Sequence, residues 1–250
     1  MAVAVIMIVR LDKFLADMGY GTRSQVKKEM AKGSVILNGR PIRRPETKID
    51  TEKDTVRWKG EPAVYERYEY FMLNKPYGVV SATEDGREKT VLDLLRADHD
   101  GSLTHRARRG DLFPVGRLDK DTEGLLLITN DGELAHRLLS PKKHVDKVYY
   151  ARIQGKVDQD DIHLFARGVD IGDQKLTLPA ELKVLRSGNI SEVEVTLREG
   201  RYHQVKRMFR AAGKEVIYLK RLSMGSLVLD ETLAPGEFRR LTEEEVEGLC

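Results

Sequence analysis

The spacing of apolar residues near the start of the chain predicts two short helices. Within residues 10–18 the apolar positions fall on one helical face; they are Leu11, Phe14, Leu15 and Met18. Thr22 and Gln25 then have the spacing of a capping box, in which each side chain bonds a free amide at the start of a helix. This second helix should end at Gly33, because glycine readily adopts the left-handed conformation that follows many helices.

A hairpin and a charged segment follow the two helices. Residues 35–37 and 40–42 read as strands joined by Asn38-Gly39, a pair that adopts the positive φ angles of a tight turn. Residues 61–69 are rich in charge, contain Pro62 and lack an apolar period. They therefore predict a linker.

The linker separates a small unit from a larger one. Residues 8–60 predict a small α/β unit of two helices and a hairpin, and residues 70–250 predict an irregular mixture of strands and helices. The expected strands are 70–74, 79–81, 125–129, 148–153, 193–197 and 216–219. The expected helices are 91–95, 133–139, 162–166, 202–212 and one capped by Thr242 and Glu245. Few neighbouring strands are separated by a full crossover helix, which favours an α+β fold with a mixed, largely antiparallel sheet.

Charge is distributed unevenly along the chain. The 250 residues have a net charge of +3, but the first 60 carry 13 Lys and Arg against 7 Asp and Glu. A small basic unit on a nearly neutral body suggests that the basic part binds a polyanion: RNA, DNA or an acidic membrane surface. The hydrophobic content of 40% suffices for ordinary cores. No stretch approaches the roughly 20 apolar residues that span a bilayer.

Cysteine and histidine usage argues against disulfide and metal chemistry. The single cysteine, Cys250, can form no internal disulfide, and a reducing cytoplasm is the natural location. The six histidines show no metal-ligand spacing and no glycine-rich phosphate loop follows a strand, so we expect no metal and no cofactor. The apolar residues 1–9 lack the features of a secretory signal, and Met7 is an alternative start of translation.

Basic side chains gather on the predicted helix–hairpin unit. They are Arg10, Lys13, Arg23, Lys27, Lys28 and Arg40. With its segments Arg-Leu-Asp-Lys-Phe-Leu, Thr-Arg-Ser and Val-x-x-Asn-Gly, this unit resembles the small RNA-binding domain first seen in ribosomal protein S-four. Such domains dock on phosphates and helix shape, and we assign Arg23, Lys27 and Lys28 to RNA binding. The alternative is a solvated surface without a ligand.

One segment ahead of a hydrophobic strand has the residue types of a catalytic loop. Residues 116–132 read Gly-Arg-Leu-Asp-Lys-Asp-Thr-Glu-Gly-Leu-Leu-Leu-Ile-Thr-Asn-Asp-Gly, and the strand can hold Asp119 firmly. Alone, Gly-Arg-Leu-Asp is a short match, and a loop aspartate is more often a cap or a surface charge. The whole segment resembles the central motif of pseudouridine synthases of the RsuA type. Residues 71–78, 147–149 and 199–209 match further motifs of that family in order.

The resemblance implies the isomerisation of a uridine in ribosomal RNA. The bond from ribose to a ring nitrogen breaks and the uracil rejoins through a ring carbon, without redox change or cofactor. This implies Asp119 as the essential ionised carboxylate, either as nucleophile or as base. Lys206 is implied as its basic partner, because a nearby cation favours a carboxylate's charged form. Tyr149 is implied to stack on the uracil and to assist a late proton transfer.

Further residues of the matched motifs are assigned to substrate binding. Arg117 is implied to fill the space that the flipped uridine leaves in its stack. Lys75 of the first motif and Arg207, beside the lysine partner, are expected to contact the RNA. We interpret Asp121 as a cap beside Thr122 and not as a second catalytic acid.

Alternatives exist both for the RNA that is modified and for the class of protein. The form Tyr-His-Gln-Val-Lys-Arg-Met, with His203, resembles the small-subunit (16S) type, and a large-subunit (23S) enzyme of the same family is the alternative. A non-catalytic ribosome-assembly factor would use the same RNA-binding unit. A glycosidase would need two carboxylates across the bond, and the second lacks a candidate. We expect a monomer acting on ribosomal RNA, either free or in an assembling small-subunit particle.

Overall fold

The computed structural model describes residues 8–96, 110–140 and 143–249. Met7 and Cys250 lie outside these residues. The chain divides into two compact units: among the described residues, the first comprises residues 8–69 and 110–112, and the second comprises the rest from Tyr70 onward. Among the described helices, none is long and apolar enough to cross a membrane. Each unit is described by itself below.

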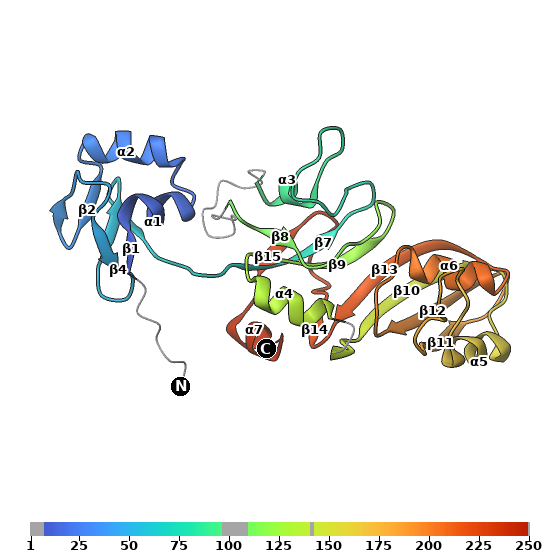
Figure 1. Ribbon diagram of the computed structural model, residues 1–250. Helices are drawn as coiled ribbons and strands as arrows, with labels where there is room; N and C mark the ends of the chain where they lie inside the picture. Colours follow the sequence, from blue (N-terminus) through green and yellow to red (C-terminus); the bar gives the residue numbers. More distant parts are fainter. Residues whose placement is uncertain (1–7, 97–109, 141–142, 250) are drawn as a thin grey trace. The chain divides into compact units, whose positions relative to one another are not determined.

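The first unit contains two helices and short antiparallel strands (Figure 1). Its elements are β1 (Ile8–Arg10), α1 (Leu11–Asp17), α2 (Arg23–Ala31), β2 (Val35–Leu37), β3 (Arg40–Pro41), β4 (Lys48–Asp50), β5 (Val56–Trp58) and β6 (Glu61–Ala63). Four strands form a sheet in the order β3-β2-β5-β6, and β1 pairs with β4. The apolar face predicted for α1 is buried in a core that it shares with α2 and the strands.

The local signals of this unit are confirmed. The Thr22 side chain accepts from the Gln25 amide, and the Gln25 side chain accepts from the Thr22 amide, so both halves of the capping box form. Asn38 and Gly39 have φ angles of 48° and 79°, as the tight turn between β2 and β3 requires.

The prediction of a linker over residues 61–69 is wrong at its start. Glu61–Ala63 form β6, which pairs with β5 at the edge of the sheet, where the missing amide of Pro62 is tolerated. Ala63 is buried, and the ring of Tyr65 lies 5.8 Å from that of Phe14. This strand was missed because three residues are too few to show an apolar period.

The second unit is a mixed sheet with helices. Its strands are β7 (Tyr70–Lys75), β8 (Phe113–Pro114), β9 (Glu123–Thr129), β10 (Lys147–Gln154), β11 (Glu181–Arg186), β12 (Ile190–Leu197), β13 (Glu215–Met224), β14 (Leu227–Val228) and β15 (Phe238–Arg240). The main path runs β11-β12-β10-β13-β9-β7-β15. Among these paired strands only β9 and β13 are parallel, which confirms the predicted α+β class. The strand expected at 79–81 is absent: Val80 makes an isolated bridge to Thr90.

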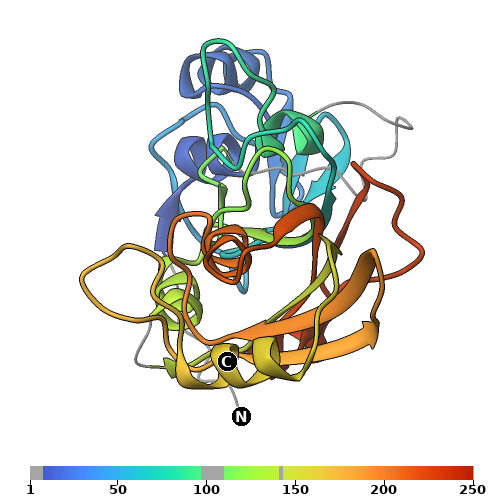
Figure 2. The same ribbon diagram turned by 90° about the vertical axis from the view of Figure 1, so that its right-hand side faces the viewer.

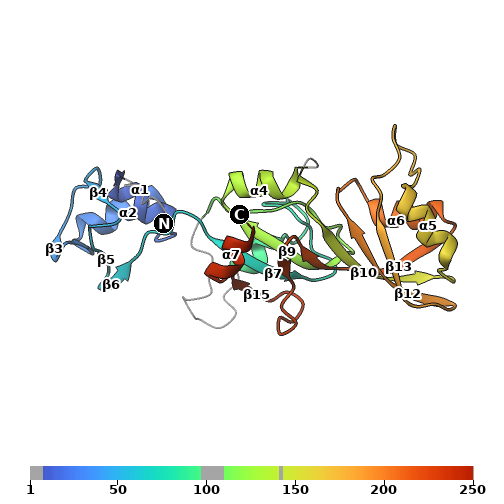
Figure 3. The same ribbon diagram turned by 90° about the horizontal axis from the view of Figure 1, so that it is seen from below.

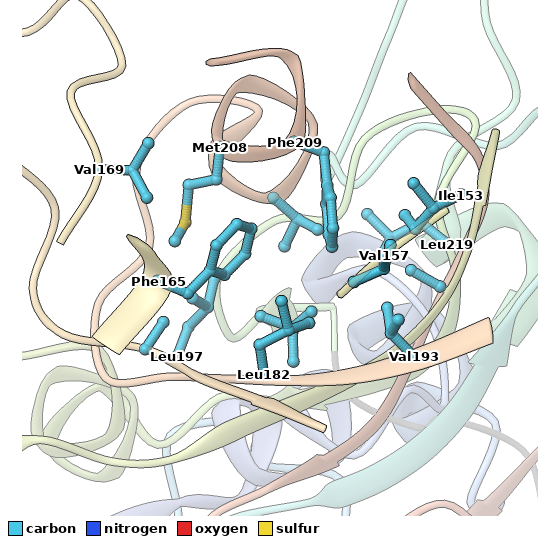
Figure 4. Close-up of a cluster of buried hydrophobic side chains, with 14 of the residues drawn as sticks. Ile153, Val157, Phe165, Val169, Leu182, Val193, Leu197, Met208, Phe209 and Leu219 are labelled. Carbon is cyan, nitrogen blue, oxygen red and sulfur yellow. The ribbon is translucent and has the colours of Figure 1, made fainter. Parts of the chain in front are cut away.

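The helices of this unit are α3 (Val91–Arg96), α4 (Gly132–Leu139), α5 (Gln159–Arg167), α6 (Gln204–Ala211) and α7 (Glu243–Leu249). Helices α5 and α6 pack on the same face of β10, β12 and β13 (Figures 2 and 3). Figure 4 shows the resulting core, in which the rings of Phe165 and Phe209 lie 4.8 Å apart. This core holds the N-terminal end of α6 in place beside the sheet.

Candidate active site

A pocket of about 580 Å³ opens where the helix-covered sheet meets the loop before β9. The loop contributes Gly116 to Lys120, α6 contributes Gln204 to Lys206, and the strands contribute Lys147, Tyr149 and Arg221. The volume lies in the range of small-ligand sites. The pocket therefore lies beside the apolar core. The loop, the helix and the strands each contribute polar side chains to it.

Hydrogen bonds from the segment after β7 hold the backbone of the loop that carries Asp119. The Ser81 hydroxyl donates to the Leu118 carbonyl at 2.9 Å and accepts from the Leu118 amide at 3.1 Å. The Gly78 amide donates to the carbonyl of Lys120 at 2.8 Å. The segment after β7 thus fixes the loop on both sides of the aspartate.

Lys75 supports the same loop from beneath. Its side chain is fully buried, and its ammonium donates to the carbonyls of Thr122 at 2.8 Å, Pro76 at 3.1 Å and Lys120 at 3.3 Å. Lys75 does not line the pocket. The structure therefore places Lys75 beneath the loop and not at the pocket, and its three N–H groups are used within the protein.

The charge on Lys75 yields a pH-dependent prediction. Burial lowers the pKa of Lys75 to about 8, against the opposing effects of the carboxylates Asp121, Glu123 and Asp119. Above that pH the neutral amine has two N–H donors for three carbonyls. We expect the single-turnover rate to fall as the pH rises through about 8, and this alkaline fall to be absent in Lys75→Met, whose overall rate is lower. A fall of equal size in both proteins would contradict the assignment.

Stability should change in the opposite direction over the same range. The pKa of this lysine is lower in the folded protein than the ordinary value of 10.5. The unfolded chain therefore binds more protons between pH 8 and 10.5, and this group raises the free energy of unfolding as the pH increases. Denaturant unfolding of wild type and Lys75→Met at pH 7.5 and 9.5 separates this effect from the loss of activity.

Asp119 and Lys206 form the ion pair that the sequence predicts. Lys206 Nζ lies 2.9 Å from Asp119 Oδ2, although the residues are 87 positions apart. The two side chains are 25% and 20% exposed, so the pair is partly shielded from solvent. Burial acts against the charge on Lys206, but hydrogen bonds to Asp121 and Asp119 raise its pKa above the ordinary value. Lys206 is therefore a permanent cation beside the carboxylate.

Asp121 has a different role from the predicted cap. Its carboxylate lies 2.5 Å from Lys206 Nζ and is about half exposed. Burial opposes ionisation, but the hydrogen bond from Lys206 keeps the pKa of Asp121 below its ordinary value. The prediction of a cap is thus corrected: Asp121 is the second carboxylate on the lysine.

His203 is a neighbour of Asp119 that the sequence interpretation missed. Its Nε2 lies 3.5 Å from Asp119 Oδ1, and its ring stacks on that of Tyr202 at a centroid distance of 3.8 Å. The residue precedes α6 in the left-handed conformation, with φ of 49°. The sequence could have indicated this contact, because His203 lies three positions before Lys206 and residues at that spacing share one side of a helix.

Tyr149 and Arg117 both line the pocket, whereas Arg207 does not. Arg117 is exposed, and Tyr149 is half-buried on β10. Arg207 turns away, donating to the carbonyl of Ile171 and forming an ion pair with Asp173 at 2.5 Å. The structure therefore does not bring Arg207 to the pocket; its guanidinium joins α6 to the loop that follows α5.

Gly124 allows two strands to approach closely behind the loop. It pairs with Arg221 where β9 and β13 run parallel. Gly124 has φ of +98°, and a Cβ there would lie 2.3 Å from the carbonyl oxygen of Arg221. Any other residue would both strain the backbone and clash with the neighbouring strand.

The basic residues of the first unit surround a buried carboxylate. Asp12 accepts two hydrogen bonds of 2.9 Å from Arg10, and Lys27 Nζ lies 4.0 Å away. Burial opposes its charge, but Arg10 and Arg23 keep the pKa of Asp12 below its ordinary value. Arg23, Lys27 and Lys28 are all exposed on α2. Basic side chains therefore lie around the Asp12 carboxylate at one surface of the unit.

The fold and site together define an RNA-modifying enzyme. The family model for RNA pseudouridylate synthase matches residues 69–211, and that for the S4 domain matches residues 9–56. The chain belongs to the RNA pseudouridylate synthase family and is a pseudouridine synthase.

Individual relatives are similar over almost their whole length. The chain is 50% identical to the uncharacterized RNA pseudouridine synthase YtzG of Bacillus subtilis, over 95% of this chain and 97% of that one. It is 41% identical to ribosomal small subunit pseudouridine synthase A of Escherichia coli, over 95% and 98% of the two chains. A crystal structure of a pseudouridylate synthase matches with a TM-score of 0.65 and 38% identity, covering 97% of this chain and 100% of that one.

Proposed function

We propose that this enzyme converts one uridine of 16S ribosomal RNA to pseudouridine, with Asp119 as the essential carboxylate. The observation that carries the chemistry is the Asp119–Lys206 ion pair of 2.9 Å at a pocket large enough for a base. The 16S target is supported by the relatives named for the ribosomal small subunit, at 41% identity. A 23S target is the second candidate.

The residues of the pocket suit the steps of this reaction. Asp119 acts at the sugar, either attacking C1′ or removing the C2′ proton when the bond from C1′ to N1 breaks. Lys206 keeps that carboxylate ionised. Tyr149 stacks on the detached uracil while it turns to present C5, and its hydroxyl assists removal of the C5 proton. Arg117, exposed at the pocket, takes the place of the flipped base in the RNA stack.

The target is tested by mapping. Pseudouridines in 16S and 23S RNA are compared in cells with and without the protein, and in both RNAs after treatment with purified enzyme. Loss of one 16S site in the deletion, regained in vitro, is the expected result. A lost 23S site would assign the second candidate. Comparing naked 16S RNA with a partly assembled particle identifies the preferred substrate, and we propose a cytoplasmic monomer as the active form.

Replacing Lys206 should lower the reaction rate without weakening RNA binding. Lys206→Met removes the charge beside Asp119, and we expect the single-turnover rate at saturating RNA to fall about 10²–10³-fold. Lys206→Arg keeps the charge with a different reach and should retain more activity. Combined with Asp119→Asn, Lys206→Met should cost nothing further, because residues that act as one unit are not additive.

A basic residue on the same helix provides the control for this series. Arg210→Met removes one exposed charge from α6 without touching the pocket, and its rate should match that of wild type. Full activity in Lys206→Met would show that the lysine is dispensable for the chemistry.

The first unit should supply the electrostatic part of RNA binding. Replacing Arg23, Lys27 and Lys28 by Ala should weaken binding and reduce the slope of log Kd against log salt by about 2–3, roughly one counterion for each lost contact. The rate at saturating RNA should change less. A matched triple variant at Lys32, Lys53 and Lys59 removes equal charge from groups already paired with carboxylates. Equal salt slopes in wild type and the α2 variant would contradict the assignment.

A further inference from the structure

Arg221 of β13 has unused hydrogen-bonding capacity at the pocket. It lines the pocket but is only 2% exposed. Its Nε donates to the Leu125 carbonyl at 2.7 Å, which fixes the guanidinium against β9. Its Nη2 is buried and has no hydrogen-bond partner among the described residues. An unsatisfied buried donor is costly, so a group that accepts from it is expected to bind here.

A second buried cation lies at the same pocket. Arg221 is directly opposite Tyr149 in the β10–β13 pairing, which is irregular between Val148 and Tyr149. Lys147 lies two positions before Tyr149 on the same strand, and all three side chains line the pocket. Lys147 is 7% exposed, lines the pocket and donates to the Val145 carbonyl at 2.9 Å. Burial and the charge of Arg221 lower the pKa of Lys147, against the opposing effect of Asp146.

These two buried cations differ from Lys206 and Arg201 at the same pocket. Lys206 has Asp119 and Asp121, and Arg201 has Glu199 and Asp173. Within the described part of the chain, neither Arg221 nor Lys147 has a carboxylate in an ion pair; Asp146 is paired with Arg198. Two neighbouring buried cations without an anion oppose folding, and the arrangement becomes favourable when negative charge appears between them and the ring of Tyr149.

We propose that Arg221, assisted by Lys147, stabilises the negative charge that develops on uracil when its bond to ribose breaks. The inference rests on the proposed reaction. The C1′–N1 bond breaks with its electron pair going to the uracil, where N1, O2 and O4 share the charge. Asp119 either bonds C1′ and is displaced when C5 attacks that carbon, or removes the C2′ proton and returns it when the new bond forms. The pair returns as the C1′–C5 bond forms, C5 loses its proton and N1 gains one. Nothing else is consumed.

The position of the cations favours the base over a backbone phosphate. They line the pocket together with Tyr149, and the apolar side chains of Leu197, Leu219 and Val205 line the same pocket. A phosphate is charged before and after the reaction, so cations bound to it would stabilise the ground state equally. Uracil enters neutral and is charged only after cleavage. Fixed donors in a water-poor site then act on the transition state.

The test compares two substrates in single-turnover experiments. Arg221→Met should lower the rate on uridine-containing RNA about 10²–10³-fold, as for loss of one transition-state donor, with Kd within about threefold of wild type. Arg221→Lys should regain part of the rate, and Lys147→Met should show a smaller loss. On the same RNA carrying 5-fluorouridine, the electron-withdrawing fluorine makes the base a better leaving group but leaves C5 without a proton to lose. The rate is therefore measured as disappearance of the original nucleoside, and the loss in Arg221→Met should shrink at least tenfold. Arg152→Met, on the opposite face of β10, is the control.

Several results would overturn the proposal. A raised Kd and a shallower salt slope, with a normal rate at saturation, would assign the cations to a phosphate. Equal losses on both substrates would show that Arg221 only shapes the pocket. Should Arg221→Met unfold because the bond to Leu125 is lost, the same comparison is made with Arg221→Lys and Lys147→Met. Wild-type enzyme that forms no pseudouridine would instead contradict the proposed function, independently of these variants.

Discussion

Asp119→Asn should abolish pseudouridine formation while leaving RNA binding intact. The amide keeps the size of the carboxylate and can still accept from Lys206, so the loop and the pocket should persist. It can neither attack C1′ nor remove a proton as a carboxylate does. We expect the single-turnover rate to fall at least about 10³-fold, as for other reactions that lose their essential group. Mass spectrometry of nuclease-digested RNA measures the product, and filter binding measures Kd.

Asp121→Asn is the matched control for this prediction. Asp121 also pairs with Lys206, but its carboxylate is about half exposed and does not line the pocket. Its replacement should lower the rate by no more than about tenfold, since an exposed ion pair contributes little. If Asp119→Asn retained activity within a few-fold of wild type, Asp119 would not be the essential group. Equal losses in the two variants would show that both carboxylates take part.

Gly124→Ala should be among the most destabilising single substitutions in the second unit. The new Cβ would lie 2.3 Å from the Arg221 carbonyl oxygen and 2.8 Å from its amide nitrogen, and both are backbone atoms that cannot rotate away. Strain at positive φ and overpacking together suggest a loss of about 3 kcal/mol or more. A domain of this size should melt roughly 6–12 °C lower.

Gly132→Ala tests whether the effect is specific to the close approach of the strands. Gly132 begins α4, and an added Cβ meets nothing within 4 Å. Its melting temperature should equal or exceed that of wild type, because alanine favours a helix more than glycine does. A Gly124→Ala protein with unchanged melting temperature would show that β9 and β13 can separate without loss. Where the variant remains folded, its rate should still fall, because β9 anchors the Asp119 loop.

Local sequence was sufficient for elements whose cause lies within a few residues. The capping box of Thr22 and Gln25 and the turn at Asn38-Gly39 depend on nearest neighbours, and both form as predicted. The strand at β9 was predicted because its apolar run is continuous and buried on both faces. Strands such as β6 and β15, of three residues each, were missed because their pairing partners, not their composition, define them.

Residue types and their spacing were enough to identify the family, the loop of Asp119 and, through the motif match, the lysine that pairs with it. Which other charges reach the pocket depends on how the chain folds. Lys75 was expected at the RNA but is buried beneath the loop, and Arg207 points toward Asp173. Arg221 was not singled out, yet β13 places it opposite Tyr149. The physical reason is that a side chain's environment depends on strand register and helix rotation. Strand register and helix rotation depend on packing between segments far apart in the chain, so they do not follow from residue type alone.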